Sequence, residues 1–231
     1  MLLRRKKLKN IRKLIEVGGD ILDLLAPFIA PNWLTQMLCY QGRNKLTQRM
    51  LAWSKTLYDH AIQTAVYAEI VGQTLGYQKN DLDNLTQGAF FHDIGKISWP
   101  KSFMTKQKPN NDDFKLMRGH PIAGEYYLSE IWPEVPSEVC RIVREHHERV
   151  DGSGYPKGLK NDEIYPLSII VAAVEVFVAL LEDRPYRSNC FTHKDALKEL
   201  EKQLFPREII NILARIKIMM VEVEAIKRVS I

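Results

Sequence analysis

The segment Phe90-Phe91-His92-Asp93-Ile94-Gly95-Lys96 places an imidazole and a carboxylate directly after two large apolar side chains. Polar groups that follow such a pair into a protein core need partners, because burying them unpaired costs several kcal/mol. A metal ion is one partner that suits a neutral imidazole beside an ionised carboxylate. An ordinary hydrogen-bonded His-Asp pair in a helical turn is the alternative. The positions of the other histidines bear on this choice.

Apolar residues recur at helical spacing along most of the chain after residue 46. One stripe of small and apolar side chains, which stops near Gly76, comprises Leu57, Ala61, Thr64, Ala65 and Ala68. Asp81 is expected to cap the next helix, with His92 and Asp93 in its last turn and Gly95 as its stop signal. No strong alternating pattern, internal repeat or low-complexity tract is present. The sequence therefore predicts an all-α protein.

Three later segments complete the helical pattern. Asn111 or Asp112 is expected to cap a helix that runs through His120. Another helix, starting near Pro136, is expected to end in His146-His147-Glu148-Arg149. The run Ile169 to Leu181 is the most apolar segment and contains a single charged residue, Glu175. Glutamate is rarely buried without a partner, so this side chain is expected to have one. Helices are also predicted at 194–204 and 207–229.

The length of 231 residues predicts one large domain with a short appendage. We expect a basic helical N-terminal extension at residues 1–45 and one domain at residues 46–231. The extension carries seven cations before residue 14, so it either touches anionic lipid or nucleic acid or packs on the domain, and packing is the preferred alternative.

Composition also bounds where the protein is expected to work. No apolar run approaches the roughly 18–20 residues of a membrane span, so an integral membrane segment is not expected. Three scattered cysteines favour a reducing, cytoplasmic setting, with peripheral membrane contact through the basic N-terminus left open. A nucleic-acid polymer is not expected as the main partner.

Five of the six histidines lie on or at the ends of apolar helices: His60, His92, His120, His146 and His147. Together with Asp93 and Glu175 they provide more ligands than one metal ion needs. Two ions about 3.5–4 Å apart, bridged by a carboxylate, would use them all. Imidazole and carboxylate ligands without thiolates suit iron or manganese, with zinc as a third candidate. Five separate hydrogen-bonded histidines are the less favoured alternative.

Several motifs together resemble the HD-GYP domain in order and spacing, over residues 56 to 206. They are His60, His92-Asp93-Ile94-Gly95-Lys96, Gly119-His120-Pro121, His146-His147-Glu148-Arg149, Asp151-Gly152, Gly154-Tyr155-Pro156 and Arg184-Pro185-Tyr186-Arg187. The resemblance implies an HD-type helical bundle. It also implies a metal-dependent phosphodiesterase that opens bacterial cyclic di-GMP to the linear dinucleotide.

The resemblance assigns the ligands of two divalent metal ions. The first would take His60, His92, Asp93 and the acid at 175, and the second His120, His146 and His147, with Asp93 bridging. Thr56 stands where some family members have the glutamate of a third metal, so two ions are expected.

The resemblance also implies roles in catalysis and substrate binding. Asp93 and Lys96 would be catalytic, with Lys96 beside the scissile phosphate. Tyr155, Arg184 and Arg187 would hold the phosphates or a base. A hydroxide shared by the ions would attack phosphorus, because a water between two cations loses its proton near neutral pH.

Glu175 and Val178 depart from the family pattern, which usually has Asp at both positions. The departures leave a second hypothesis, a catalytically weak or inactive relative that senses a cyclic dinucleotide or serves as an adaptor. Its Gly154-Tyr155-Pro156 loop would contact a partner such as a diguanylate cyclase. A third hypothesis is an HD hydrolase acting on another phosphate ester. The cyclic di-GMP phosphodiesterase is the prediction.

Overall fold

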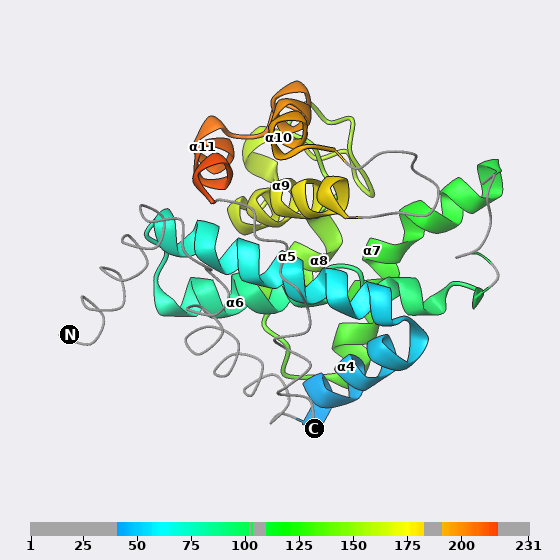
Figure 1. Cartoon of the computed structure of the whole chain (residues 1–231). Coiled ribbons are helices and arrows are strands. Elements are labelled where there is room, and N and C mark those ends of the chain that lie inside the picture. Colours follow the sequence, from blue (N-terminus) through cyan, green and yellow to red (C-terminus); the bar gives the residue numbers. More distant parts are fainter. Residues whose placement is uncertain (1–40, 102, 104–109, 183–190, 217–231) are drawn as a thin grey trace.

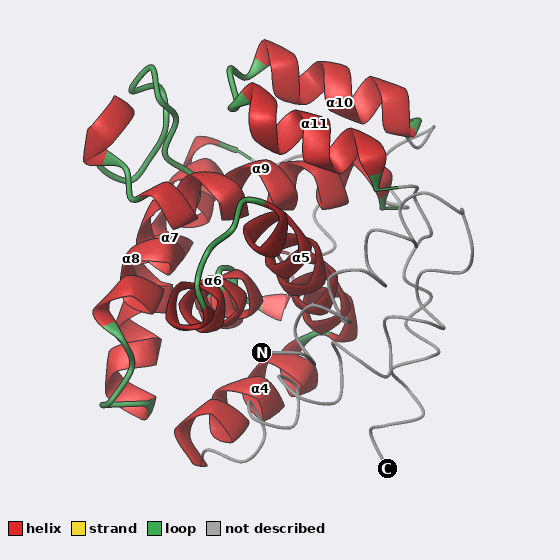
Figure 2. Cartoon of the chain, turned by 90° about the vertical axis from the view of Figure 1, so that its left-hand side faces the viewer, coloured by secondary structure: helices red, strands yellow, loops and turns green. Residues whose placement is uncertain are grey.

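The computed structural model describes residues 41–101, 103, 110–182 and 191–216, and these fold into packed helices (Figure 1). In chain order the elements are α4 (Gln41–Trp53), α5 (Lys55–Thr74), α6 (Lys79–Phe91), the 3-10 helix η1 (Ile94–Ser98), α7 (Asn111–Ile131), α8 (Ser137–Glu145), the 3-10 helix η3 (Asn161–Glu163), α9 (Pro166–Leu181), α10 (His193–Lys202) and α11 (Arg207–Arg215). Within these ranges no strand occurs, only an isolated bridge between Asp151 and Lys160 (Figure 2). The all-α prediction is confirmed.

Helix α5 lies at the centre of the bundle and packs against α6 and α9. Its small-residue stripe permits this close approach, since Ala61, Ala65 and Ala68 are fully buried. The core around it is filled by large side chains such as Phe90, Phe91 and Phe177. Burial of this apolar surface supplies the main driving force for folding.

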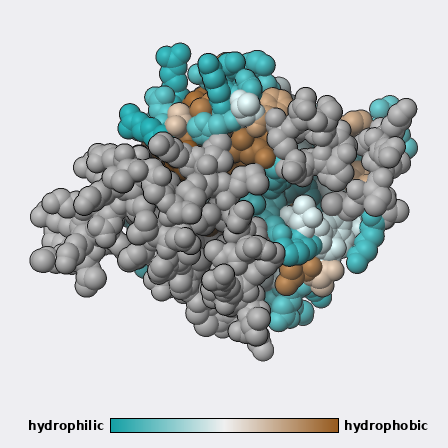
Figure 3. Space-filling view, in the orientation of Figure 1, coloured by the Kyte–Doolittle hydropathy of each residue, from teal (hydrophilic) through white to brown (hydrophobic). Residues whose placement is uncertain are grey.

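The helices α10 and α11 form an outer layer on α9. Figure 3 shows hydrophilic residues along the top of this face, over α10 and α11, and apolar residues beneath them. Ala196 and Leu200 supply the buried side of α10. This layer closes the core on the side away from α4.

Two local expectations about α6 are wrong. Its N-cap is Gln78 rather than Asp81. Asp81 lies in the first turn, where its negative charge interacts favourably with the helix dipole. The helix ends at Phe91, and Gly95 lies in η1 rather than serving as a stop. A Cβ atom at Gly95 would meet the carbonyl oxygen of His120 at 2.0 Å, so glycine is needed here for close packing on α7.

Helix α9 contains the predicted apolar run, with Pro166 in its first turn, where the missing N–H costs nothing. At the other end of the domain, residues 41–45 are part of α4, so they share a helix with the start of the domain predicted at 46. The predicted extension at 1–40 and the end of the last predicted helix lie outside the described residues. None of the described helices has the length and hydropathy that crossing a membrane requires.

Candidate metal centre

Side chains from four places in the fold meet at one buried point. His60 comes from α5, His92 and Asp93 from the junction of α6 and η1, His120 from α7, and His146 and His147 from the end of α8. They form two groups that share Asp93: His60, His92 and Asp93, and Asp93, His120, His146 and His147. In each group, the candidate ligand atoms lie within 4.8 Å of one another.

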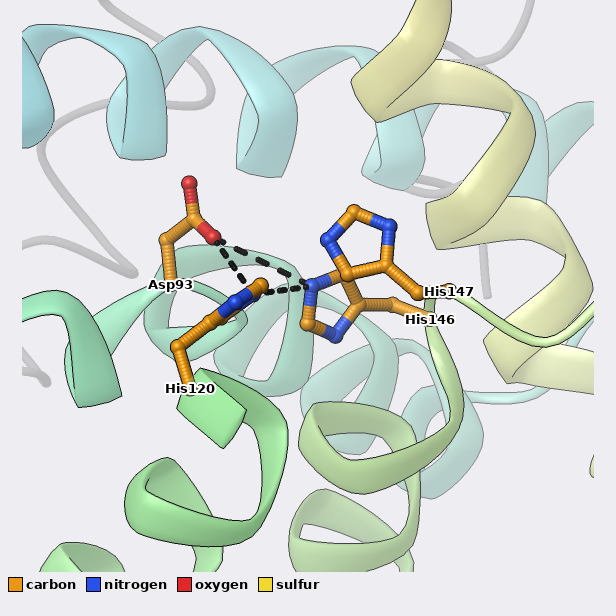
Figure 4. A group of neighbouring side chains, drawn as sticks. All are labelled: Asp93, His120, His146 and His147. Atoms are coloured by element: carbon orange, nitrogen blue, oxygen red, sulfur yellow. Dashed lines mark hydrogen bonds and ion pairs between the residues drawn. The ribbon is translucent and has the colours of Figure 1, made fainter. Parts of the chain in front are cut away.

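Asp93 lies between the imidazoles and is only 1% exposed. Its Oδ1 atom is 3.1 Å from Nε2 of His120 and 3.9 Å from Nε2 of His146 (Figure 4). Its Oδ2 atom is 3.3 Å from Nε2 of His92. The carboxylate therefore faces ring nitrogens from both groups.

Three of the imidazoles are oriented by the same local hydrogen bond, from Nδ1–H to the carbonyl oxygen three residues earlier. The pairs are His92 with Ala89 at 2.7 Å, His120 with Met117 at 2.6 Å and His146 with Val143 at 2.8 Å. Because a carbonyl oxygen can only accept, Nδ1 carries the proton in each ring, and Nε2 of the neutral ring presents a lone pair. This arrangement is typical of metal-binding histidines.

The lone pairs converge at short range. Nε2 of His120 lies 3.2 Å from Nε2 of His146. Neither atom carries a proton when both rings are neutral with Nδ1–H, so the two lone pairs and the nearby Asp93 oxygen repel one another. A cation between them converts this repulsion into attraction. Among the described residues, Nε2 of His92 and Oδ1 of Asp93 are also buried without a hydrogen-bond partner. The donor set fits a divalent metal ion.

The protonation states of His146, His147 and Asp93 favour binding of a metal ion by the group that contains them. Burial, with further contributions from the neighbouring imidazoles, holds the pKa values of His146 and His147 well below the ordinary histidine value, which leaves both rings neutral. Burial alone would raise the pKa of Asp93, but the charges of Lys96 and His92 outweigh it and hold the pKa well below its usual range. Burial likewise opposes the charged form of His92, but Asp93 outweighs it and raises the pKa.

His60 is oriented from a distant part of the chain. Its Nδ1 atom lies 2.7 Å from Oε1 of Glu182, which follows the last residue of α9, so this nitrogen donates to the carboxylate. Glu182 is absent from the residues predicted from the sequence. The two residues are 122 positions apart, and no local pattern connects them.

The expected substrate-binding residues lie in part around this centre. The ammonium group of Lys96 contacts the carboxylate of Asp93. The ring of Tyr155 stacks on His147, with centroids 4.6 Å apart and an angle of 23° between the planes. Burial, followed by the charge of Glu175, raises the pKa of Tyr155 and keeps its hydroxyl protonated. Arg184 and Arg187 lie outside the described residues.

Glu175 is half-buried on α9 and belongs to neither group of candidate ligands. Its charge nevertheless contributes to raising the pKa of His92, after the larger effects of burial and Asp93. The side chain therefore lies in the electrostatic environment of the centre. Val178, three residues later on the same helix, is buried in the apolar core. Metal binding by Glu175 stays a prediction.

Residues 41–204 match the sequence profile of the HD domain. The chain belongs to the HD-domain family. The match covers more than half of the chain and confirms the family resemblance.

Curated relatives of this HD domain are phosphodiesterases of cyclic dinucleotides. The 3'3'-cGAMP-specific phosphodiesterase 1 of Vibrio cholerae is 31% identical over 163 residues, 67% of this chain and 37% of that protein. The cyclic di-GMP phosphodiesterase response regulator RpfG of Xanthomonas campestris pv. campestris is 36% identical over 152 residues, 64% of this chain and 40% of that protein. The chain thus spans no more than about two fifths of either relative.

A solved structure supports the fold. Bd1817, an HDG"Y"P protein from Bdellovibrio bacteriovorus, matches with a TM-score of 0.59 and 21% identity, over 88% of this chain and 66% of that chain. At this identity the likeness concerns the fold alone.

The Gly-Tyr-Pro loop of the HD domain is held against the end of α8 by buried polar contacts. The carboxylate of Glu148 accepts hydrogen bonds from the backbone N–H groups of Lys157 at 2.7 Å and Leu159 at 3.0 Å. The N–H of Tyr155 donates to the carbonyl of His147 at 3.1 Å. A Cβ atom at Gly154 would meet the Cα of Glu148 at 2.5 Å. These contacts place the Tyr155 ring on His147.

Proposed function

We propose that this HD domain is a metal-dependent phosphodiesterase that opens cyclic di-GMP to the linear dinucleotide. The observation that carries the proposal is the convergence of imidazole Nε2 atoms on the buried carboxylate of Asp93. The family and the named activities of the relatives support the same class of reaction. The relatives are named for two different cyclic dinucleotides, so cyclic di-GMP is the more specific part of the proposal.

The proposed metal sites use the two groups described above. His60, His92 and Asp93 would hold one divalent ion, with Glu175 as a further ligand, and His120, His146 and His147 would hold the second, with Asp93 shared. When bound, iron or manganese, or zinc as a third candidate, would supply Lewis acidity and an activated water. Asp93 would stay ionised and hold the ions together.

Other side chains would act on the substrate directly. The ammonium of Lys96 would offset the charge that grows on the phosphoryl oxygens during the reaction. Tyr155 would border the substrate above His147. Burial of the centre would exclude bulk solvent, apart from the water that reacts, and would strengthen these interactions. A diguanylate cyclase partner at the Gly154-Tyr155-Pro156 loop has no support from the relatives and is not part of the proposal.

Metal analysis and a hydrolysis assay test the proposal together. The purified protein, loaded with iron or manganese, is expected to hold two ions and to convert cyclic di-GMP to the linear dinucleotide. His120→Ala should lose metal and activity, whereas the control His193→Ala should retain both, because His193 belongs to neither group and its Nε2 faces the carbonyl of Leu213 at 3.2 Å.

The position of Glu175 favours one rival function, a sensor that binds the cyclic dinucleotide without cutting it. A missing ligand would leave one ion incompletely held. Tight binding of cyclic di-GMP by the fully loaded protein without turnover in either metal would establish the sensor instead of the enzyme. Turnover of another phosphate ester alone would favour the third hypothesis of a different HD hydrolase.

A further inference from the structure

Arg118 lies close to the candidate metal centre but takes no part in it. It is an exposed residue of α7, two positions before His120. Its guanidinium carbon lies over the ring of Tyr155, 5.5 Å from the centroid. Tyr155 in turn stacks on His147. One aromatic ring therefore connects this cation to a candidate metal ligand.

Among the described residues, Arg118 has no ion-pair partner. Other basic residues nearby on α7 and α8 do have one: Lys115 pairs with Asp112 at 3.1 Å, and Arg141 with Glu145 at 2.7 Å. A guanidinium that stacks on an aromatic ring keeps the N–H groups at its edge available. Those groups match two oxygens of a phosphate in a bidentate arrangement.

The helix that carries Arg118 and the loop that carries Tyr155 are both stabilised by local hydrogen bonds. Helix α7 starts with a capping box, in which Asn110 and Asp113 exchange hydrogen bonds between side chain and backbone at 2.6 and 2.9 Å. The opposite partner, Tyr155, belongs to the loop that Glu148 holds. The helix that carries Arg118 and the loop that carries Tyr155 are thus each held by hydrogen bonds of their own.

A cyclic dinucleotide carries two phosphates, and only one is cleaved at a time. In the proposed function, the metal ions and Lys96 would neutralise the scissile phosphate. The negative charge of the second phosphate would then need a different cationic partner. We propose that Arg118 binds this second, non-scissile phosphate and so favours cyclic dinucleotides over small phosphodiesters. The inference rests on the proposed function and adds a specificity-determining residue to it.

The test compares a substrate that has two phosphates with one that has a single phosphate. Arg118→Ala should raise KM for cyclic di-GMP by about tenfold to a hundredfold, the effect of losing hydrogen bonds to a charged group, and leave kcat within about twofold. KM for bis(p-nitrophenyl) phosphate should stay unchanged. Arg118→Lys should recover part of the loss. Lys115→Ala, which removes another exposed cation of the same helix, is the matched control and should alter neither substrate.

Calorimetric binding of cyclic di-GMP to the metal-loaded protein provides a readout independent of turnover. The Kd should rise in Arg118→Ala by a factor similar to that of KM, with metal content unchanged. An unchanged Kd and KM would overturn the inference, as would an equal loss with both substrates, which would show that Arg118 acts through Tyr155 and His147. If the wild type binds but does not cleave, the Kd still decides. Failure to bind would overturn this inference, while hydrolysis of the small ester would separately uphold phosphodiesterase chemistry.

Discussion

At the scale of single residues, the candidate centre depends on orientation as much as on composition. His92, His120 and His146 each donate a hydrogen bond from Nδ1–H to a carbonyl oxygen of the adjoining helix, and this directs Nε2 toward Asp93. His60 achieves the same through Glu182. Each ring can rotate about its side-chain bonds, so fixing it in advance lowers the entropic cost of binding an ion.

Glu175→Asp tests whether the longer acid limits the centre. The family pattern places Asp here, and Glu175 lies outside both ligand groups. A shorter carboxylate directed at the ion should increase turnover of cyclic di-GMP by about tenfold or more, because displacements of around 1 Å can cost about a hundredfold in rate. Single-turnover rates with metal content measured in parallel check this. Lower activity with full metal content would show that the centre is adapted to Glu.

At the scale of elements, the contact between η1 and α7 brings Asp93 and His120 together. Gly95 faces the backbone of α7 at His120 and Gly124. With no side chain at this point, two backbones pack directly on each other. The spacing of Gly95 from Asp93 is visible in the sequence, but its partner helix is not.

Gly95→Ala should separate η1 from α7. Its Cβ atom would meet the His120 carbonyl at 2.0 Å and the Gly124 nitrogen at 2.6 Å, both rigid backbone atoms. The free energy of unfolding should fall by about 1–3 kcal/mol or more, and the affinity for metal should fall with it. Gly119→Ala is the control, since nothing lies within 4 Å of its Cβ position, and helix propensity should make it neutral or stabilising by about 1 kcal/mol. Urea unfolding measures the free energy of unfolding of the two variants. An equal change in Gly95→Ala and Gly119→Ala would contradict the packing argument.

A second element, the Gly-Tyr-Pro loop, depends on one buried carboxylate. Glu148→Ala should leave the N–H groups of Lys157 and Leu159 without their acceptor, at a local cost of about 1–3 kcal/mol. Hydrogen exchange at these two amides should accelerate, while the core of α5 stays protected. Glu163→Ala removes an exposed acceptor of the Lys160 N–H and should leave the loop unchanged. Unchanged exchange in Glu148→Ala would show that other contacts hold the loop.

At the scale of the whole molecule, the proposed binding of metal by the buried cluster is coupled to folding. Its ligands come from α5, the α6–η1 junction, α7 and α8, so the sites exist only when these elements are packed together. An ion that binds the folded state alone shifts the folding equilibrium by mass action. The same ion would relieve the repulsion among the facing nitrogens.

Manganese should therefore raise the melting temperature. At 100 times its Kd, binding adds about 2.7 kcal/mol, which corresponds to a rise of roughly 5–10 °C for a domain of this size. A chelator should reverse the rise. The double variant His120→Ala/His146→Ala should lose much of it, and His193→Ala should keep it. The same rise in the double variant would place the binding of manganese elsewhere.

The sequence alone determined the helical class, and it pointed to five histidines and Asp93 as candidate metal ligands. Helical periodicity is a local property, so the apolar stripes of α5 and α9 predicted those helices before any packing was known. The HD-GYP motifs, together with the resemblance they carry, predicted the grouping of His60 and His92 apart from His120, His146 and His147. The structure places these histidines in two such groups around Asp93, without the expected acid at 175, and metal binding by them stays a prediction.

Only the tertiary structure decided the contacts that connect distant segments. Glu182 meets His60 across 122 positions, Gly95 meets the backbone of α7, and Arg118 meets the ring of Tyr155. None of these pairs has a local signature, because each depends on how finished helices pack. Glu175 is a further example: its residue type is read directly from the sequence, but the position of its side chain is not. Its position relative to Asp93 and the imidazoles is set by the packing of α9 on α5, and this position bears on the choice between the proposed phosphodiesterase and the rival sensor.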